Sequence, residues 1–183
     1  LAMPVSQVRE TLEFIAPDLQ ENTVVLDTSP VKSNVAKWAK ELLPEGRYYV
    51  GLAPAINPVY MHDFQFGQAA AKADLFANGL FLIDAPYGTP EEAVTTAVDF
   101  VRLLEALPLL ADPMESDGLM STTHILPQLV AASLLNATVD QPGWLEARKV
   151  AGRAYATVTA GLAYQDEIDS LRISSLQNRA GMI

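Results

Sequence analysis

Short apolar runs alternate with longer segments of helical periodicity along the first 111 residues of the chain. Runs rich in β-branched and apolar residues predict buried strands at residues 23–26, 48–52, 80–83 and 107–110, and residues 1–4 look like the end of another. Between them, apolar residues at helical spacing predict helices between residues 4 and 17 and at 30–42, 68–76 and 90–104. Strands that alternate with helices imply an α/β fold with a mostly parallel sheet and right-handed crossovers.

Two helix starts carry capping signals. Ser29 is expected to be an N-cap, with Pro30 in the first helical position. Thr89 is expected to cap a later helix, because Pro90 comes next and Glu92 stands where a capping box places its glutamate. Both signals indicate where a helix should begin after a strand.

The pattern changes after Asp112-Pro113, where two long helical segments follow at residues 119–135 and 144–162 with no strand between them. Small side chains form a stripe along the second segment, and such a stripe lets another helix approach closely. These residues are Ala147, Ala151, Ala154, Val158 and Gly161. A helical bundle or a dimer core is the natural interpretation. We therefore expect an α/β domain at residues 1–111 and an all-α domain at residues 112–183.

Composition narrows the range of functions. Half of the 183 residues are apolar and 19% are charged, which is typical of a globular protein. The net charge of −10 argues against a nucleic-acid partner, because no basic stripe is present. The chain has no cysteine, which excludes a disulfide, a thiolate zinc site and a cysteine nucleophile. No run of about 18 apolar residues is present, so we expect no membrane span, and a cytoplasmic location fits these features.

Three stretches carry a more specific signal. They are DTSPVK at residues 27–32, GLAP at residues 51–54, and Asp117-Gly118 followed by TTHILPQ at residues 122–128. In this order they resemble the Asp-Val-Gly-Ser-Val-Lys turn, the Gly-Gly-His-Pro segment, and the His-Asp and Ser-His-Leu-Pro-His helix of the prephenate/arogenate dehydrogenase family. The similarity covers nearly the whole chain. It implies an NAD(P)-dependent enzyme of tyrosine biosynthesis, with a Rossmann-like domain followed by a helical dimerisation domain.

The same resemblance bears on the cofactor. In that family the glycine-rich phosphate loop lies in the first β-α unit, whereas residues 1–4 match a strand downstream of it. The chain therefore looks like an internal piece of a longer protein. We expect NAD or NADP to bind the intact parent but not this fragment alone. The resemblance places Pro4, Asp27, Thr28 and Pro54 on the cofactor side.

The catalytic histidine of the family has no direct counterpart. Its position in the His-Pro segment is Ala53 here, and the histidine of the later helix aligns with Ile125. His124 lies one residue earlier, which turns its side chain by about 100° around the helix. It is the best remaining candidate for a catalytic base, and the alternative is a histidine on a helix surface or a capped histidine in the core.

Four residues are candidates for substrate binding. Ser29 is one residue from the family's serine, and its alternative role is the N-cap. Arg148 and Lys149 lie where the family has an arginine that grips a carboxylate, and their alternative is an exposed helix face. Gln128 aligns with the last histidine of the motif and could form a hydrogen bond but could not transfer a proton. Lys32 is expected to be a solvated residue of the first helical turn rather than a ligand contact.

The leading hypothesis is an NAD(P)-dependent oxidoreductase that oxidatively decarboxylates a small carboxylated substrate and forms a homodimer through its helical domain. One alternative is a non-catalytic dimerisation or ligand-sensing module that retained the fold and lost the histidine. Another is a hydroxyacid dehydrogenase-like enzyme with another base and another substrate. Because the two histidines are far apart and cysteine is absent, a metal site has no support.

Overall fold

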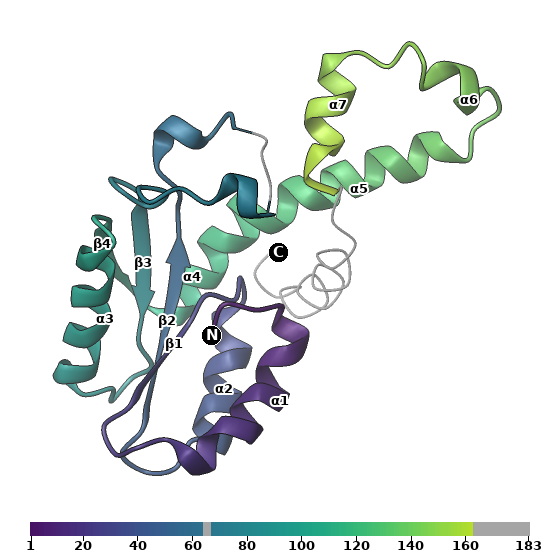
Figure 1. Ribbon diagram of the computed structural model, residues 1–183. Coiled ribbons are helices and arrows are strands. Elements are labelled where there is room, and N and C mark those ends of the chain that lie inside the picture. The colour runs from purple at the N-terminus through teal and green to yellow at the C-terminus, as the bar shows by residue number, and fades with distance from the viewer. Residues whose placement is uncertain (64–66, 163–183) are drawn as a thin grey trace. The chain divides into compact units, whose positions relative to one another are not determined.

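The computed structural model describes residues 1–63 and 67–162 (Figure 1). Contacts divide the chain into two compact units, Leu1–Asp117 and Gly118–Ile183. Residues 163–183, which the sequence assigned to the helical domain, lie outside the described residues. In the described part of the chain, no helix is both long enough and apolar enough to cross a membrane.

The first unit is built on a four-stranded sheet in the order β1-β2-β3-β4. The strands are Val24–Asp27 (β1), Tyr48–Pro54 (β2), Leu80–Asp84 (β3) and Leu107–Ala111 (β4). The pairs β1–β2 and β3–β4 are parallel, whereas β2 and β3 are antiparallel. The described chain between β2 and β3 contains 3₁₀ turns but no α-helix, so it lacks the crossover that a parallel pair requires. The expected α/β sheet is confirmed as mostly parallel, with one antiparallel step.

Three α-helices cover the two faces of this sheet: Val5–Ile15 (α1), Lys32–Leu42 (α2) and Glu91–Leu103 (α3). Figure 1 shows α1 beside α2, with α3 on the opposite side of the strands. Adjacent residues of β2 lie on opposite faces of the sheet. Tyr49 packs in the hydrophobic cluster that includes α1 and α2, whereas Val50 packs in the cluster that includes α3. The sheet is therefore buried on both faces along β2.

The chain before α1 differs from the prediction. Residues 1–4 form no strand. The Leu1 amine nevertheless donates a hydrogen bond to the Leu26 carbonyl, and the Thr28 amide donates to the Leu1 carbonyl at 3.0 Å. Leu1 thus lies alongside β1 without forming a strand of its own.

The α-helix predicted at residues 68–76 is also wrong. This alanine-rich segment contains a 3₁₀ helix, Gly67–Ala70, followed by turns. Residues 71–74 are exposed, so this part of the segment buries no apolar face. Alanine content alone does not hold a short helix in water, because most helical stability in proteins comes from packing.

Neither predicted helix cap forms. Helix α2 has Val31 as its N-cap residue and no side-chain cap on its own N-terminal segment, so Ser29 is not the N-cap. Helix α3 begins after Pro90, also without a side-chain cap. The Thr89 hydroxyl instead donates to the Pro86 carbonyl at 2.7 Å, within the loop that precedes the helix.

A continuous helical segment begins in the first unit and carries on into the second. Its parts are Pro113–Met120 (α4), the π-helical turn Ser121–Ile125, and Leu126–Val139 (α5). The helix predicted at residues 119–135 is therefore confirmed. Pro127 lies in the first turn of α5, where its missing amide costs little.

The second long helix predicted from the sequence is wrong. Residues 144–162 form three short pieces, Trp144–Ala147 (α6), Arg153–Thr159 (α7) and the 3₁₀ helix Ala160–Leu162. The break falls before Gly152, which is extended and destabilises a helix interior by about 1 kcal/mol relative to alanine. The stripe of small residues therefore does not lie on one helix face.

Candidate functional site

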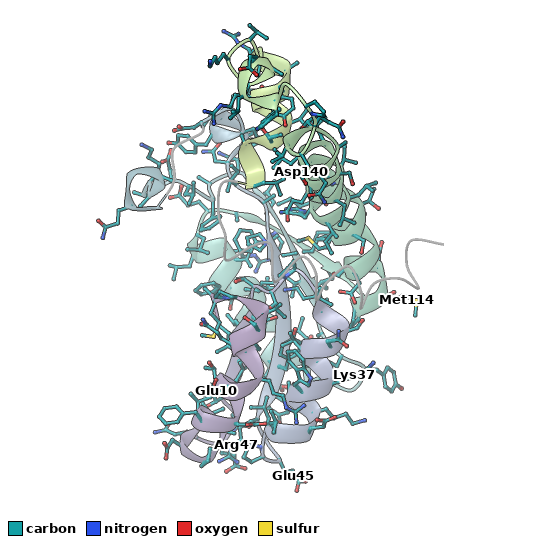
Figure 2. All side chains as sticks on the ribbon, turned by 90° about the vertical axis from the view of Figure 1, so that its right-hand side faces the viewer. Glu10, Lys37, Glu45, Arg47, Met114 and Asp140 are labelled. Carbon is teal, nitrogen blue, oxygen red and sulfur yellow. The ribbon has the colours of Figure 1, made fainter. Side chains whose placement is uncertain are left out.

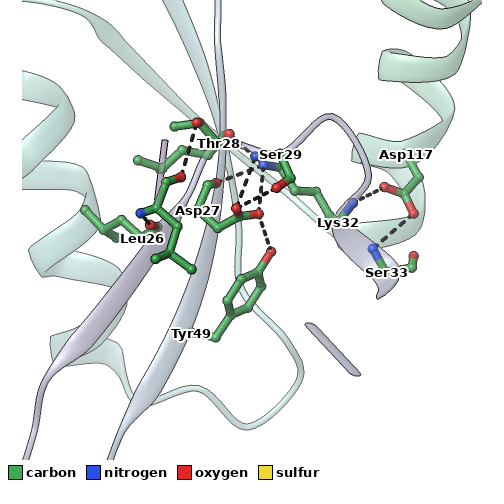
Figure 3. Close-up of polar contacts among 10 residues, drawn as sticks. Leu26, Asp27, Thr28, Ser29, Lys32, Ser33, Tyr49 and Asp117 are labelled. Carbon is green, nitrogen blue, oxygen red and sulfur yellow. Dashed lines mark hydrogen bonds and ion pairs between the residues drawn. The ribbon is translucent and has the colours of Figure 1, made fainter. Parts of the chain in front are cut away.

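A cluster of buried polar side chains lies where β1 ends (Figure 3). Asp27 closes β1 and has no exposed surface. Its Oδ1 accepts hydrogen bonds from the Ser29 amide at 3.2 Å and the Ser29 hydroxyl at 2.7 Å. Its Oδ2 accepts one from the Tyr49 hydroxyl at 3.2 Å. Burial, together with the Asp27 carboxylate, raises the pKa of Tyr49 well above its usual value, so this hydroxyl remains a donor.

Lys32 begins α2 and is also fully buried, so the expectation that it is solvated is wrong. Its ammonium donates to the backbone carbonyls of Asp27 at 2.9 Å and Leu52 at 2.7 Å. It lies 3.7 Å from the Asp27 carboxylate. Burial lowers the pKa of Lys32, and neighbouring carboxylates, that of Asp27 first, oppose this change. The ammonium thereby joins the backbones of two neighbouring strands.

Asp117, in α4, supplies the cap that α2 lacks locally. Its Oδ1 accepts the Lys32 amide at 2.6 Å and its Oδ2 accepts the Ser33 amide at 3.2 Å. A carboxylate at this position satisfies two free amides and interacts favourably with the positive end of the helix dipole. The cap is 85 residues away from Lys32 along the chain, which explains why the local sequence pointed to Ser29 instead.

Asp84 closes β3 and is buried next to Gly51. Gly51 pairs with Asp27 of β1 on one side and with Asp84 on the other, so a carboxylate flanks it in each neighbouring strand. A Cβ at Gly51 would lie 2.5 Å from Oδ1 and 2.8 Å from Oδ2 of Asp84. The glycine therefore leaves the space that this carboxyl group occupies.

The Asp84 carboxyl is the least compensated acid of the cluster. Burial raises its pKa to about 6, although the Lys32 ammonium opposes the rise. Ser116 lies close enough to favour the charged form, but neither its Oγ nor Oδ1 of Asp84 has a hydrogen-bond partner among the described residues. Asp84 is thus a buried group that can hold a proton near neutral pH.

The charged groups of this cluster are engaged by other groups of the protein. Within residues 1–63 and 67–162, no group of three or more His, Cys, Asp or Glu side chains could hold a metal ion. The carboxylates of Asp27 and Asp117 are occupied by internal donors, and the Lys32 ammonium is occupied by backbone carbonyls. The cluster therefore joins the ends of the strands and holds the buried Asp84 carboxyl, whose pKa is raised, between them.

The sequence of residues 1–107 matches a family model described as the nucleotide-binding domain of prephenate dehydrogenase. The chain belongs to this family. It is 29% identical over 139 residues to the prephenate dehydrogenase of Bacillus subtilis (strain 168), which covers 75% of the chain and 36% of that protein.

Solved structures share the fold. The prephenate dehydrogenase of A. aeolicus in complex with hydroxyphenyl propionate and NAD+ has a TM-score of 0.80 at 17% identity, covering 99% of this chain and 60% of the other. The arogenate dehydrogenase of Synechocystis has a TM-score of 0.70 at 20% identity, covering 99% and 63%. The chain therefore spans less than two thirds of these relatives.

The part of the prephenate dehydrogenase domain described here does not fit the pyrophosphate of a dinucleotide. The sequence contains no Gly-x-Gly-x-x-Gly loop. The N-terminus of α2, which follows β1, is the kind of position that binds a phosphate. Its first amides already donate to the Asp117 carboxylate. A carboxylate there repels a second anion. The N-terminus of α2 therefore offers no free phosphate site.

The residues placed on the cofactor side by the family resemblance lie in three settings. Thr28 is half-buried and donates from both its amide and its hydroxyl to the Leu1 carbonyl, at 3.0 and 3.3 Å. Pro54 ends β2 and is half-buried, whereas Pro4 is exposed before α1. Asp27 and Ser29 contact each other, and their polar atoms are used within the protein.

The candidates in the second unit are more exposed. His124 lies in the π-helical turn, is exposed, and has Nδ1 2.9 Å from the Thr123 hydroxyl. Gln128 is half-buried and lies four residues later, a spacing that places two side chains on the same helix face. Arg148 and Lys149 are exposed just after α6. His124 and Gln128 thus lie on one continuous helical segment, whereas the two cations lie on a separate short segment.

Sequence reasoning missed Asp84, Tyr49 and Ser116. Asp84 had a signal, because it ends an apolar strand in the same way as Asp27 does. An aspartate that closes a buried strand has to be paired or protonated. Tyr49 and Ser116 had no such signal, since a tyrosine in a strand and a serine in a helix have many ordinary roles.

Proposed function

We propose that this chain is part of an NAD(P)-dependent oxidoreductase that oxidatively decarboxylates prephenate or arogenate, small carboxylated substrates of tyrosine biosynthesis. The family match over residues 1–107 carries this proposal. Further support comes from the names of its relatives, a prephenate dehydrogenase and an arogenate dehydrogenase, and from the NAD+ in the A. aeolicus structure. A protein with this activity would contain a phosphate-binding segment in addition to these residues.

In this proposal, the first unit lacks the base of the family. Lys32 bonds the carbonyls of Asp27 and Leu52, and the residue after Leu52 is Ala53, at the family's histidine position. Alanine cannot accept a proton, so another side chain has to act as the base. His124 is our candidate, because a neutral imidazole is suited to deprotonating a hydroxyl near neutral pH.

The substrate carboxylate would bind the cations of the second unit. Arg148 can form a bidentate pair with a carboxylate, whereas Lys149 offers a point charge. Gln128 would contribute a hydrogen bond, because its amide can donate and accept. Ser29 is a weaker candidate than the sequence indicated, since its hydroxyl is buried and donates to Asp27.

The test is NADH or NADPH formation by the intact protein with prephenate and with arogenate. His124→Asn should lower turnover on the order of 10²–10⁴-fold, the usual contribution of a general base. His62→Asn is the matched control, because His62 is the other histidine and is exposed in a loop. Unchanged turnover in His124→Asn would remove this residue from the mechanism.

Absence of activity with both substrates would contradict the proposed reaction. In that case Ala53→His becomes informative, because it restores the family's histidine. Activity gained by this variant would identify a dehydrogenase that lost its base. Continued inactivity would favour a protein that binds ligands without catalysis.

We also propose a homodimer through the helical unit. The support is a set of large apolar side chains in the described part of that unit that are at least 43% exposed. They are Leu119, Leu126, Val130, Val139, Leu145, Val150 and Val158. Light scattering at tens of micromolar should show twice the mass of one chain, and a monomer of normal thermal stability would contradict the dimer.

A further inference from the structure

A cavity of about 600 Å³ lies in the first unit, between the end of α2, the beginning of β2 and the loop after β3. Because β3 runs antiparallel to β2, this loop lies beside the amino end of β2 rather than at its carboxyl end. The cavity thus lies toward the amino end of β2, whereas Asp27 at the end of β1 pairs with Gly51 further along that strand, and Tyr49 contributes to both the cavity and the buried cluster. Its volume is within the range of roughly 300–1,000 Å³ that is usual for small-molecule sites.

The lining of this cavity is cationic. Lys37, Lys40 and Arg47 contribute to it, and no acidic side chain does, although the chain has a net charge of −10. Within the described residues, neither lysine forms an ion pair or a side-chain hydrogen bond. Figure 2 shows Lys37 projecting outward from α2, and Arg47 near the end of that helix.

Arg47 is held in place without being neutralised. Its guanidinium donates to the Leu19 carbonyl at 2.8 and 3.1 Å and to the Glu45 carbonyl at 2.8 Å. These partners are backbone dipoles and carry no net charge, and Arg47 has no carboxylate partner among the described residues. A fixed positive charge at a cavity attracts an anion.

The remaining lining is largely aromatic and apolar. Three tyrosines take part, namely Tyr48, Tyr49 and Tyr87, together with Ala39 and Leu43. Tyr49 is 5% exposed and its hydroxyl already donates to Asp27, so the ring is what it can offer to a ligand. Flat aromatic surfaces stack on flat ligands.

A neighbouring cavity provides an internal comparison. It has a volume of about 370 Å³ and shares Tyr48 with the larger one. Its lining includes Glu92 and no cation. The side chains that line these two neighbouring cavities therefore carry charges of opposite sign, and of the two the larger cavity favours an anion.

We propose that the larger cavity binds a small organic anion with a flat apolar body, the anionic group being a carboxylate or a phosphate. The anion would contact Lys37 and Lys40, and the flat body would pack against the tyrosines. This site goes beyond the proposed dehydrogenase function, because none of the residues proposed for catalysis, substrate binding or cofactor binding lines it.

The experiment is a titration of the isotope-labelled 183-residue chain, followed through the backbone amide resonances of Lys37, Lys40 and Thr89. The probes are phenylacetate, phenyl phosphate, inorganic phosphate and benzyl alcohol. We expect saturable shifts with phenylacetate or phenyl phosphate. Inorganic phosphate, which has no ring, and benzyl alcohol, which has no charge, should each bind about tenfold more weakly. The stronger of the two aryl anions identifies the carboxylate or the phosphate class.

The double variant Lys37→Gln/Lys40→Gln should weaken binding about three- to tenfold, as expected for two partly solvated ion pairs. Both lysines are exposed, so the fold should tolerate these changes. Lys72→Gln is the matched control, since Lys72 is exposed and outside the lining. Equal binding of inorganic phosphate would indicate an adventitious ion only. Equal binding of benzyl alcohol, equal affinity of the double variant, shifts confined to other residues, or no saturable shift would each overturn the proposal.

Discussion

Replacing Asp84 by asparagine should change how the stability of the first unit depends on pH. The folded protein raises the pKa of Asp84 from 3.8 to about 6, because the carboxyl is buried. Between these two pH values the folded state holds a proton that the unfolded state has released. Wild-type stability therefore contains a contribution that is fully present below pH 4 and is lost as the pH rises through about 6.

The size of this contribution follows from the two pKa values. At about 1.4 kcal/mol per pKa unit, a rise from 3.8 to about 6 corresponds to ~3 kcal/mol. Asparagine has nearly the same shape and does not titrate. The free energy of unfolding of the wild type minus that of Asp84→Asn should therefore fall by ~3 kcal/mol over the whole titration, of which roughly 2.4 kcal/mol falls between pH 4 and pH 7.

Urea unfolding at several pH values measures this difference. Trp38 reports on the first unit, because it packs against the core of α1 and α2, and Trp144→Phe removes the signal of the second unit. Asp18→Asn is the control, since Asp18 is exposed. A difference between wild type and Asp84→Asn that does not change with pH would refute the assignment of a raised pKa to Asp84.

Other predictions test the same region. Gly51→Ala should destabilise the first unit by about 1–3 kcal/mol, because its Cβ would lie 2.5 Å from Asp84. Adding Asp84→Ala should recover most of that loss, and strictly additive effects in the double-mutant cycle would contradict the steric explanation. Asp117→Ala should cost about 0.5–2 kcal/mol in urea unfolding, because two amides at the start of α2 lose their cap, and an unchanged midpoint would show that the helix does not depend on it. Calorimetry of the 183-residue chain should detect neither NAD nor NADP, and micromolar binding would contradict the argument from the absent glycine loop.

Local sequence patterns were sufficient for β1 to β4 and for the helices α1, α2 and α3 of the first unit. The apolar runs that became β1 to β4 are short and bounded by turn residues, so they have few alternatives. In α1, Val8 and Leu12 recur at helical spacing and are fully buried. The family motifs were also readable, because each of them is contiguous in the chain. The family could therefore be inferred from the amino-acid sequence alone.

Periodicity misled where packing did not support it. The segments at residues 68–76 and 144–162 have helical composition, yet each forms only short helical pieces. Helix propensity contributes tenths of a kcal/mol per residue, whereas burial of a large side chain contributes roughly 1.5–3 kcal/mol. Exposed residues at 71–74 and 147–150 gain little from burial, so local preference did not decide their conformation.

The sequence by itself determined the α/β class, the positions of the strands and the family. Tertiary structure alone decided the polar cluster, because its members come from β1, β2, β3, α2 and α4. Asp117 caps α2, whose first residue, Lys32, lies 85 residues earlier in the chain. The local sequence predicted Ser29 as the cap instead, but Ser29 does not cap this helix. Lys32 looked like a solvated residue of a first turn, but the carbonyls of Asp27 and Leu52 make its burial possible. Spacing along a chain reports which side chains share a face, whereas burial and charge compensation depend on residues that only the fold brings together.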